Sequence, residues 1–180
     1  VLEGLSDVLA QWVVGGDVDF AVTTMPFATR RRGLVTDVLF HDRFVVAVGA
    51  DHALVRAPAS VAAADLLEFP WVLPPRDGTL WQRVLDLFHR HGLKAPEPQV
   101  ETNSGVCIKG LLLTGRFVSV VPRQLVAHEE AKGDIVILSA KDLYIEREVF
   151  VLTREGSILS PGAEAIIGEF RRRGAADALN

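Results

Sequence analysis

The chain has 180 residues, of which 49% are hydrophobic and 23% charged, and its formal net charge is −4. This composition is that of a globular protein and excludes a disordered chain. The negative net charge argues against a chain that binds nucleic acid over a large part of its surface. The single cysteine, Cys107, excludes an internal disulfide and fits a reducing compartment such as the cytoplasm.

The start of the chain predicts a piece of a longer protein. No apolar stretch is long enough to span a bilayer, and no signal peptide opens the sequence. The first four residues, Val1 to Gly4, read as the tail of a strand and lack an initiating Met. We therefore expect a fragment whose first residues pair with a preceding segment.

The first part of the chain predicts one helix and three extended segments. Ser6 is a suitable helix N-cap, and Gly15 follows the apolar stripe that it opens. The extended segments are residues 18–23, 34–40 and 44–48. A polar loop with three arginines at residues 30–32 separates the first two, and the charged residues 41–43 are expected to interrupt the others.

The middle of the chain predicts two strands and two helices. Ser60 is expected to cap a short helix that ends near Leu67. Strands are expected at residues 71–73 and just before Glu101. Thr79 opens a strongly periodic helix that Gly92 ends. Its apolar stripe consists of Leu80, Val84, Leu87, Phe88 and His91.

The last part continues the alternation. Asn103 or Ser104 can cap a helix over residues 105–114, which is apolar nearly all round and is therefore expected to be buried. The later helices are expected between Pro122 and Gly133 and from Pro161 onward, and the strands at residues 116–121, 135–138 and 148–152. In the last helix, Arg171 to Arg173 suit the negative end of the dipole. This alternation predicts an α/β layer fold.

The sequence does not predict an enzyme, a metal site or a cofactor. The five histidines show no metal-ligand spacing, and His89 and His91 point to different faces of a helix. No nucleophile elbow, phosphate-binding loop or dinucleotide motif is present. Cys107 is expected to be a buried structural thiol, because its helix is apolar.

Several helix starts could bind a polar ligand. Ser6, Thr79 and the pair Asn103-Ser104 each open a helix, where free amides and hydroxyls hold carboxylates or phosphates. Each of these residues could equally serve only as a helix cap. Arg76 and Trp81 could offer a cation and a stacking face, or could be an ion-paired loop arginine and a core aromatic.

The order of the segments resembles that of LysR-type transcriptional regulators. Glu3-Gly4, a capped helix and Gly16-Asp17-Val18-Asp19-Phe20-Ala21-Val22 are similar to that family's "E-G-x-x-x-x-L-x-x-G-x-x-D-x-A-I" stretch. Further similar segments follow in the family's order. They are residues 44–48 with Asp51-His52-Ala53-Leu54, residues 65–67 with Pro70-Trp71-Val72-Leu73, and residues 113–122. The resemblance covers essentially the whole chain.

The resemblance implies an effector-binding domain with the type 2 periplasmic-binding-protein-like fold, two α/β lobes joined by two crossover strands. Lobe I would be residues 1–48 and 147–180, without its first strand and helix, and lobe II would be residues 49–146. The effector would lie between the lobes. Its implied contacts are Ser6, Thr23 and Thr24 on lobe I, and Thr79, Leu80, Asn103 and Ser104 on lobe II.

The resemblance also implies the partners. A small-molecule effector would control DNA binding by an absent winged helix-turn-helix domain, in a cytoplasmic homodimer or homotetramer that does not contact a membrane. Three alternatives stay open: a solute-binding protein of a transport system with the same fold, an enzyme of that fold, and a module that mainly dimerises. Arg76 and Trp81 favour an anionic or ring-bearing effector such as a sugar or an aromatic acid.

Overall fold

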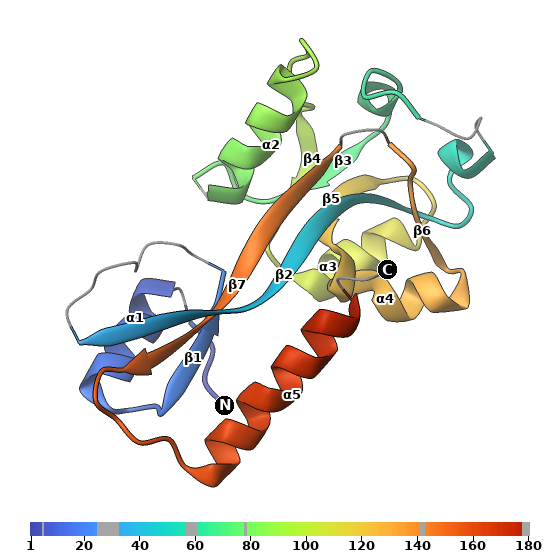
Figure 1. Cartoon of the computed structure of the whole chain (residues 1–180). Helices are drawn as coiled ribbons and strands as arrows, with labels where there is room; N and C mark the ends of the chain where they lie inside the picture. Colours follow the sequence, from blue (N-terminus) through green and yellow to red (C-terminus); the bar gives the residue numbers. More distant parts are fainter. Residues whose placement is uncertain (5, 25–32, 57–60, 78, 141–142, 178–180) are drawn as a thin grey trace. The chain divides into compact units, whose positions relative to one another are not determined.

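The structure of the chain, a computed structural model, describes residues 1–4, 6–24, 33–56, 61–77, 79–140 and 143–177. Helices and strands alternate along the chain, which confirms the predicted α/β class (Figure 1). The chain divides into two compact units, residues 1–42 with 146–180 and residues 43–145. In the described ranges, no helix is both long and apolar enough to cross a membrane.

The first unit is a small sheet with one helix on each face. Its strands are β1 (Phe20–Thr23), part of β2 (Leu34–Gly49) and most of β7 (Tyr144–Arg154), and β1 runs antiparallel to β7. The helix α1 (Ser6–Gly15) packs against Leu152, whereas α5 (Pro161–Asp177) packs against its neighbour Val151. Successive strand residues point to opposite faces, so the two helices cover opposite sides of this sheet.

The second unit is built on strands in the order β4, β3, β5, β2, with β6 also paired to β2. The bounds of these strands are β3 Trp71–Leu73, β4 Pro98–Glu101, β5 Val118–Pro122 and β6 Ile135–Ile137. β3 is parallel to both β4 and β5, and β2 is antiparallel to β5 and β6. β3 therefore lies between two parallel neighbours. The chain crosses from β3 to β4 on one side and later to β5 on the other side.

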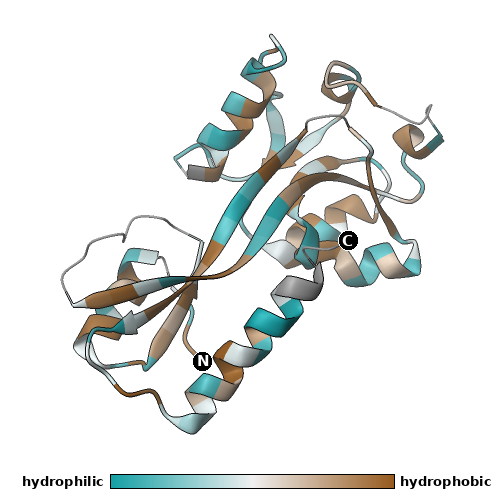
Figure 2. Cartoon of the chain, viewed as in Figure 1, coloured by the Kyte–Doolittle hydropathy of each residue, from teal (hydrophilic) through white to brown (hydrophobic). Residues whose placement is uncertain are grey.

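Three helices cover this second sheet. α2 (Thr79–His89) contributes Val84, Leu87 and Phe88 to a core that contains Val46 and Val48 of β2. α3 (Gly105–Leu112) and α4 (Arg123–Lys132) pack on the face that carries Val45 and Ala47. The hydrophobic end of β2 is visible in Figure 2, following a hydrophilic stretch. Alternate residues of one strand thus anchor α2 on one face and α3 with α4 on the other.

The predicted interruption at residues 41–43 is wrong, because β2 runs unbroken for 16 residues. The charged run is tolerated inside the strand because Asp42 has an ion-pair partner on the strand β7. Arg147 donates from Nε and Nη2 to Asp42 Oδ2, at 2.9 and 2.5 Å, and the Asp42 side chain is only 3% exposed. A tertiary contact thus overrides the local polar signal.

The predicted burial of the helix over residues 105–114 is also wrong. α3 is shorter than predicted, and Leu112 is its one buried residue, with Ile108 partly buried against the same core. Val106 is 81% exposed and Cys107 is also exposed. The helix contacts the sheet with one side only. Because apolar residues lie on nearly all sides of this helix, its sequence does not show which side is buried.

Two further predictions changed in detail. The helix expected from Ser60 to Leu67 is replaced, in the described residues, by a short 3-10 turn at Asp65–Glu68, and Ser60 itself lies outside the described residues. Another 3-10 turn, Ala53–Arg56, precedes this segment. The three arginines 171–173 do not close the last helix, because α5 continues to Asp177. Arg172 and Arg173 instead pair with Glu169 of the preceding turn.

Candidate functional site

The start of α1 and the end of β1 bring two predicted contact residues together. The hydroxyl oxygens of Ser6 and Thr23 are 2.7 Å apart. Thr23 is 7% exposed and Ser6 is half-buried, so part of this hydroxyl pair remains accessible. Thr24 follows directly and is also half-buried. The first unit therefore presents a small group of hydroxyls at the beginning of a helix.

The second unit presents a comparable edge where β3 and β4 end. The two strands are parallel, with Leu73 in register with Glu101, and the amide of Thr102 donates to the carbonyl of Leu73 at 3.0 Å. The segments that lead into α2 and α3 therefore leave from the same edge of the sheet. In open α/β sheets, ligands bind outside the carboxyl ends of the strands where the chain direction switches.

The start of α3 is capped by Ser104. Ser104 Oγ accepts from the amide of Cys107 at 3.3 Å, and the amide of Ser104 donates to Thr102 Oγ1 at 3.1 Å. This confirms the predicted cap and selects Ser104 over Asn103, although both side chains are exposed. Thr102 was missed by the sequence analysis. A hydroxyl residue at the end of a strand, one position before a polar pair, was the signal that could have identified it.

The apolar side chains in the first turn of α2 are half-buried or buried. Thr79 is the first helical residue, but its side chain lies outside the described part of the chain. Leu80 is half-buried, and Trp81 is 7% exposed within the hydrophobic core of the second unit. Trp81 thus has the packing of a core aromatic.

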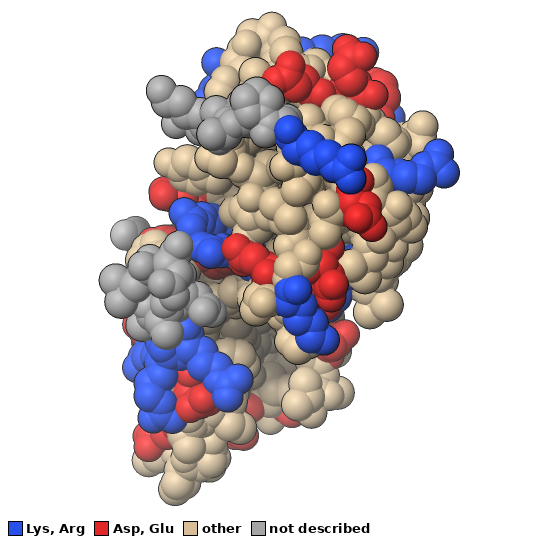
Figure 3. Space-filling view, turned by 90° about the vertical axis from the view of Figure 1, so that its right-hand side faces the viewer, with Lys and Arg blue, Asp and Glu red and all other residues tan. Residues whose placement is uncertain are grey.

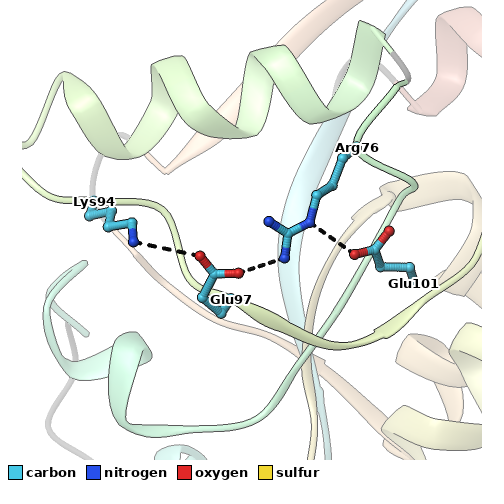
Figure 4. A network of polar contacts seen from close by, with 4 residues as sticks. All are labelled: Arg76, Lys94, Glu97 and Glu101. Atoms are coloured by element: carbon cyan, nitrogen blue, oxygen red, sulfur yellow. Dashed lines mark hydrogen bonds and ion pairs between the residues drawn. The ribbon is translucent and has the colours of Figure 1, made fainter.

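Arg76, in the segment between β3 and α2, is engaged by two carboxylates (Figure 4). Its Nη2 donates to Glu97 Oε2 at 2.5 Å and its Nε donates to Glu101 Oε1 at 3.0 Å. The guanidinium carbon also lies 5.3 Å from the ring centroid of Trp81. The hydrogen bond from Arg76 lowers the pKa of Glu97, so that carboxylate is charged at neutral pH. The three arginines 30–32 lie outside the described residues.

His52 is a buried residue that the sequence analysis did not single out as structural. It is 1% exposed, its Nδ1 accepts from the amide of Leu54 at 3.2 Å, and its ring lies 4.6 Å from that of Phe69. Because Nδ1 accepts, the proton of the neutral ring is on Nε2. Burial lowers the pKa of His52, and the backbone carbonyl of Arg116 opposes that shift.

Charge and metal chemistry add no further candidate. On the face shown in Figure 3, Lys and Arg side chains lie beside Asp and Glu side chains and form no continuous basic surface in the described part of the chain. Within the described ranges, no group of three or more His, Cys, Asp and Glu residues could hold a metal ion.

The model of the LysR substrate-binding domain family matches residues 1–175. The chain belongs to that family. Among its relatives are the HTH-type transcriptional regulators GalR of Pseudomonas putida, 29% identical over 92% of this chain, and GbpR of Azospirillum brasilense, 26% identical over 92%. The chain spans 41% and 48% of the lengths of those two proteins.

Solved structures show that the LysR-type domain has the predicted fold. The regulatory domain of Synechocystis PCC6803 CcmR in complex with 2-PG aligns with a TM-score of 0.69 at 20% identity, covering 91% of this chain and 77% of that one. The cofactor-binding domain of the Cbl regulator gives 0.74 at 18%, covering 96% and 74%. The domain therefore has the periplasmic-binding-protein-like fold of LysR regulators. A transport protein is not favoured, because the family that matches and the two relatives are those of transcriptional regulators.

Proposed function

We propose that this LysR-type domain is the sensing part of a longer, cytoplasmic transcriptional regulator and does not catalyse a reaction. The match to the family over residues 1–175 carries this proposal, and the two relatives named above are both HTH-type regulators. In such a protein, a helix-turn-helix segment elsewhere in the chain would bind DNA. The full-length protein would form a homodimer or a homotetramer. The structure supports the ligand-binding part of this function.

We propose that a small-molecule effector contacts hydroxyl-bearing helix starts in both units. In the first unit these contacts are Ser6, Thr23 and Thr24. In the second unit they are Thr79, Leu80, Asn103 and Ser104. The supporting observation is that α2 and α3 begin at the shared carboxyl edge of β3 and β4, where backbone amides without intrahelical partners are available to a polar ligand.

Effector binding would act by shifting a conformational equilibrium. A ligand changes such an equilibrium only to the extent that it binds one conformation more tightly than another. Contacts drawn from two compact units would provide that difference in affinity, because an effector that uses both sets would prefer the conformation in which both are within reach. The regulator's DNA-binding segment would respond to the resulting change.

A thermal-shift screen of metabolites against this chain, followed by calorimetry of a hit, tests the proposal. Ser6→Ala and Ser104→Ala each delete one proposed contact and should weaken binding roughly threefold to tenfold, the loss expected for one hydrogen bond. Ser160→Ala is the matched control, because Ser160 Oγ caps α5 in the same way, accepting from the amide of Ala163 at 3.2 Å. If all three variants bind the effector with equal affinity, neither Ser6 nor Ser104 contacts it.

A further inference from the structure

Arg76 joins three elements that meet at the candidate edge of the second unit. It follows β3, and its guanidinium reaches Glu97 just before β4 and Glu101 at the end of that strand. Figure 4 shows the side chain extending from the segment near α2 toward β4, with one glutamate on each side. One planar group thus connects the segment after β3 to both ends of the neighbouring strand.

The same side chain contacts the first turn of α2. The guanidinium carbon lies 5.3 Å from the centroid of the Trp81 ring, and Trp81 is itself packed in the core. An arginine held over an aromatic face gains an electrostatic attraction to the ring. The position of Arg76 is therefore coupled to the beginning of α2 through a side chain that has little freedom to move.

Arg76 is also placed next to the start of α3. Its partner Glu101 is followed directly by Thr102, whose amide bonds to Leu73 and whose hydroxyl accepts from the amide of Ser104. Movement of Glu101 would shift Thr102, and with it the residue that caps α3. Arg76 consequently contacts the start of α2 through Trp81 and is linked to the start of α3 through Glu101.

The charges of this group balance. Arg76 faces Glu97 and Glu101, and Lys94 lies 3.6 Å from Glu97. Two cations thus accompany two carboxylates, and the guanidinium is already engaged on two of its nitrogens. An arginine held in this way is better suited to ordering its surroundings than to attracting an anion.

We propose that Arg76 is a positioning residue that holds the starts of α2 and α3 in a fixed relation to each other through Glu101 and Trp81. This inference rests on the proposed function, because those two helix starts are the effector contacts assigned to the second unit. It adds that Arg76 acts on the ligand only through them. The test of this inference needs no effector. The positioning role of Arg76 can therefore be disproved while effector binding is confirmed, and effector binding can be disproved while the positioning role is confirmed.

The test is amide hydrogen exchange of the full chain, measured by NMR for the native sequence and for Arg76→Ala. The reporters are Thr102, which donates to Leu73, and Ile108, which donates to Ser104 in the first turn of α3. Both amides should exchange about threefold to tenfold faster in the variant, as expected for losing an exposed ion-pair group and a cation–π contact. Ala50, whose amide donates to Asp134 at 2.9 Å elsewhere in the same unit, should keep its native rate.

Two further variants separate positioning from a general contribution to stability. Arg76→Lys keeps the charge but replaces the planar guanidinium, so it should restore the native exchange rates only in part. Lys94→Ala removes the other cation near Glu97. The Lys94 side chain is 85% exposed, so this variant should leave the exchange rates of Thr102 and Ile108 unchanged. The proposal is overturned if Arg76→Ala leaves Thr102 and Ile108 at native rates, if Ala50 accelerates equally, or if Arg76→Lys behaves as the native chain.

Discussion

The side-chain oxygens of Ser6 and Thr23 lie 2.7 Å apart, and this contact joins the first residue of α1 to the last residue of β1. Thr23 is 7% exposed, so removing the hydroxyl of Ser6 leaves a largely buried polar atom without that partner. We expect Ser6→Ala to lower the free energy of unfolding by about 1–2 kcal/mol. Urea denaturation measures this change.

A double-mutant cycle completes that test. Thr23→Val removes the second hydroxyl while keeping the shape of the side chain, so the combined variant should lose less stability than the sum of the two single changes. Ser157→Ala is the control, because that exposed hydroxyl donates only to the carbonyl of Arg154 in a turn. Strict additivity would show that the two hydroxyls do not interact in solution.

Two glycines of α5 predict opposite effects of the same substitution. A Cβ added at Gly174 would overlap Cβ and Cγ of Phe40, whereas nothing lies within 4 Å of a Cβ added at Gly168. Gly174→Ala should therefore destabilise the chain by about 1–3 kcal/mol through overpacking. Gly168→Ala should stabilise it by about 0.5–1 kcal/mol, because alanine favours the helix. Thermal unfolding of both variants provides the comparison, and a gain of stability at Gly174 would contradict the packing of α5 on β2.

His52 predicts a loss of stability in mild acid. Its folded-state pKa is lowered from the ordinary value of 6.5, so the unfolded chain binds its proton first as the pH falls. The free energy of unfolding is therefore not reduced by His52 above pH 6.5, and it declines as the pH falls below that value. Urea unfolding between pH 7.5 and 5.5 should show a smaller decline in His52→Asn than in the native chain.

The exposed residue His91 provides the control for that pH dependence. His91→Gln should retain the native decline between roughly pH 7.5 and 5.5, because it leaves His52 and its burial unchanged. If His52→Asn and the native chain lose stability in parallel, the buried imidazole is not the group responsible.

The pair of Asp42 and Arg147 should matter far more than the exposed contact beside it. Arg147→Met removes a partner from a carboxylate that is 3% exposed and should cost about 3–5 kcal/mol. Glu148→Gln alters the neighbouring pair with His41, whose side chains are 71% and 50% exposed, and should cost less than about 1 kcal/mol. Chemical denaturation at neutral pH distinguishes the two, and similar costs would mean that Asp42 is solvated.

Local signals predicted much of the fold. Ser104 caps its helix as expected, and Ser160 caps the helix expected from Pro161, because a hydroxyl before a helix satisfies amides that would otherwise lack partners. Gly133 ends α4 with φ 79°, a conformation that a residue with a side chain rarely adopts. These features depend on neighbours within four positions, so a single sequence is enough to locate them.

Features that depend on distant residues were not predictable in this way. The ion pair that keeps β2 continuous joins residues 105 positions apart, and the partners of Arg76 are 21 and 25 positions away. From its sequence neighbours alone, Arg76 could be a ligand contact or an ion-paired loop residue. Its assignment required knowing that the segment after β3 lies beside β4, which no local pattern encodes.

The exposed thiol of Cys107 makes the candidate edge experimentally accessible. It is the single cysteine of the chain, and it lies in the first turn of α3, three residues after Ser104. A maleimide fluorophore or spin label would therefore attach at one defined place without prior removal of other cysteines. Such a reporter would register changes at the start of α3 in real time, including those caused by a metabolite found in the screen.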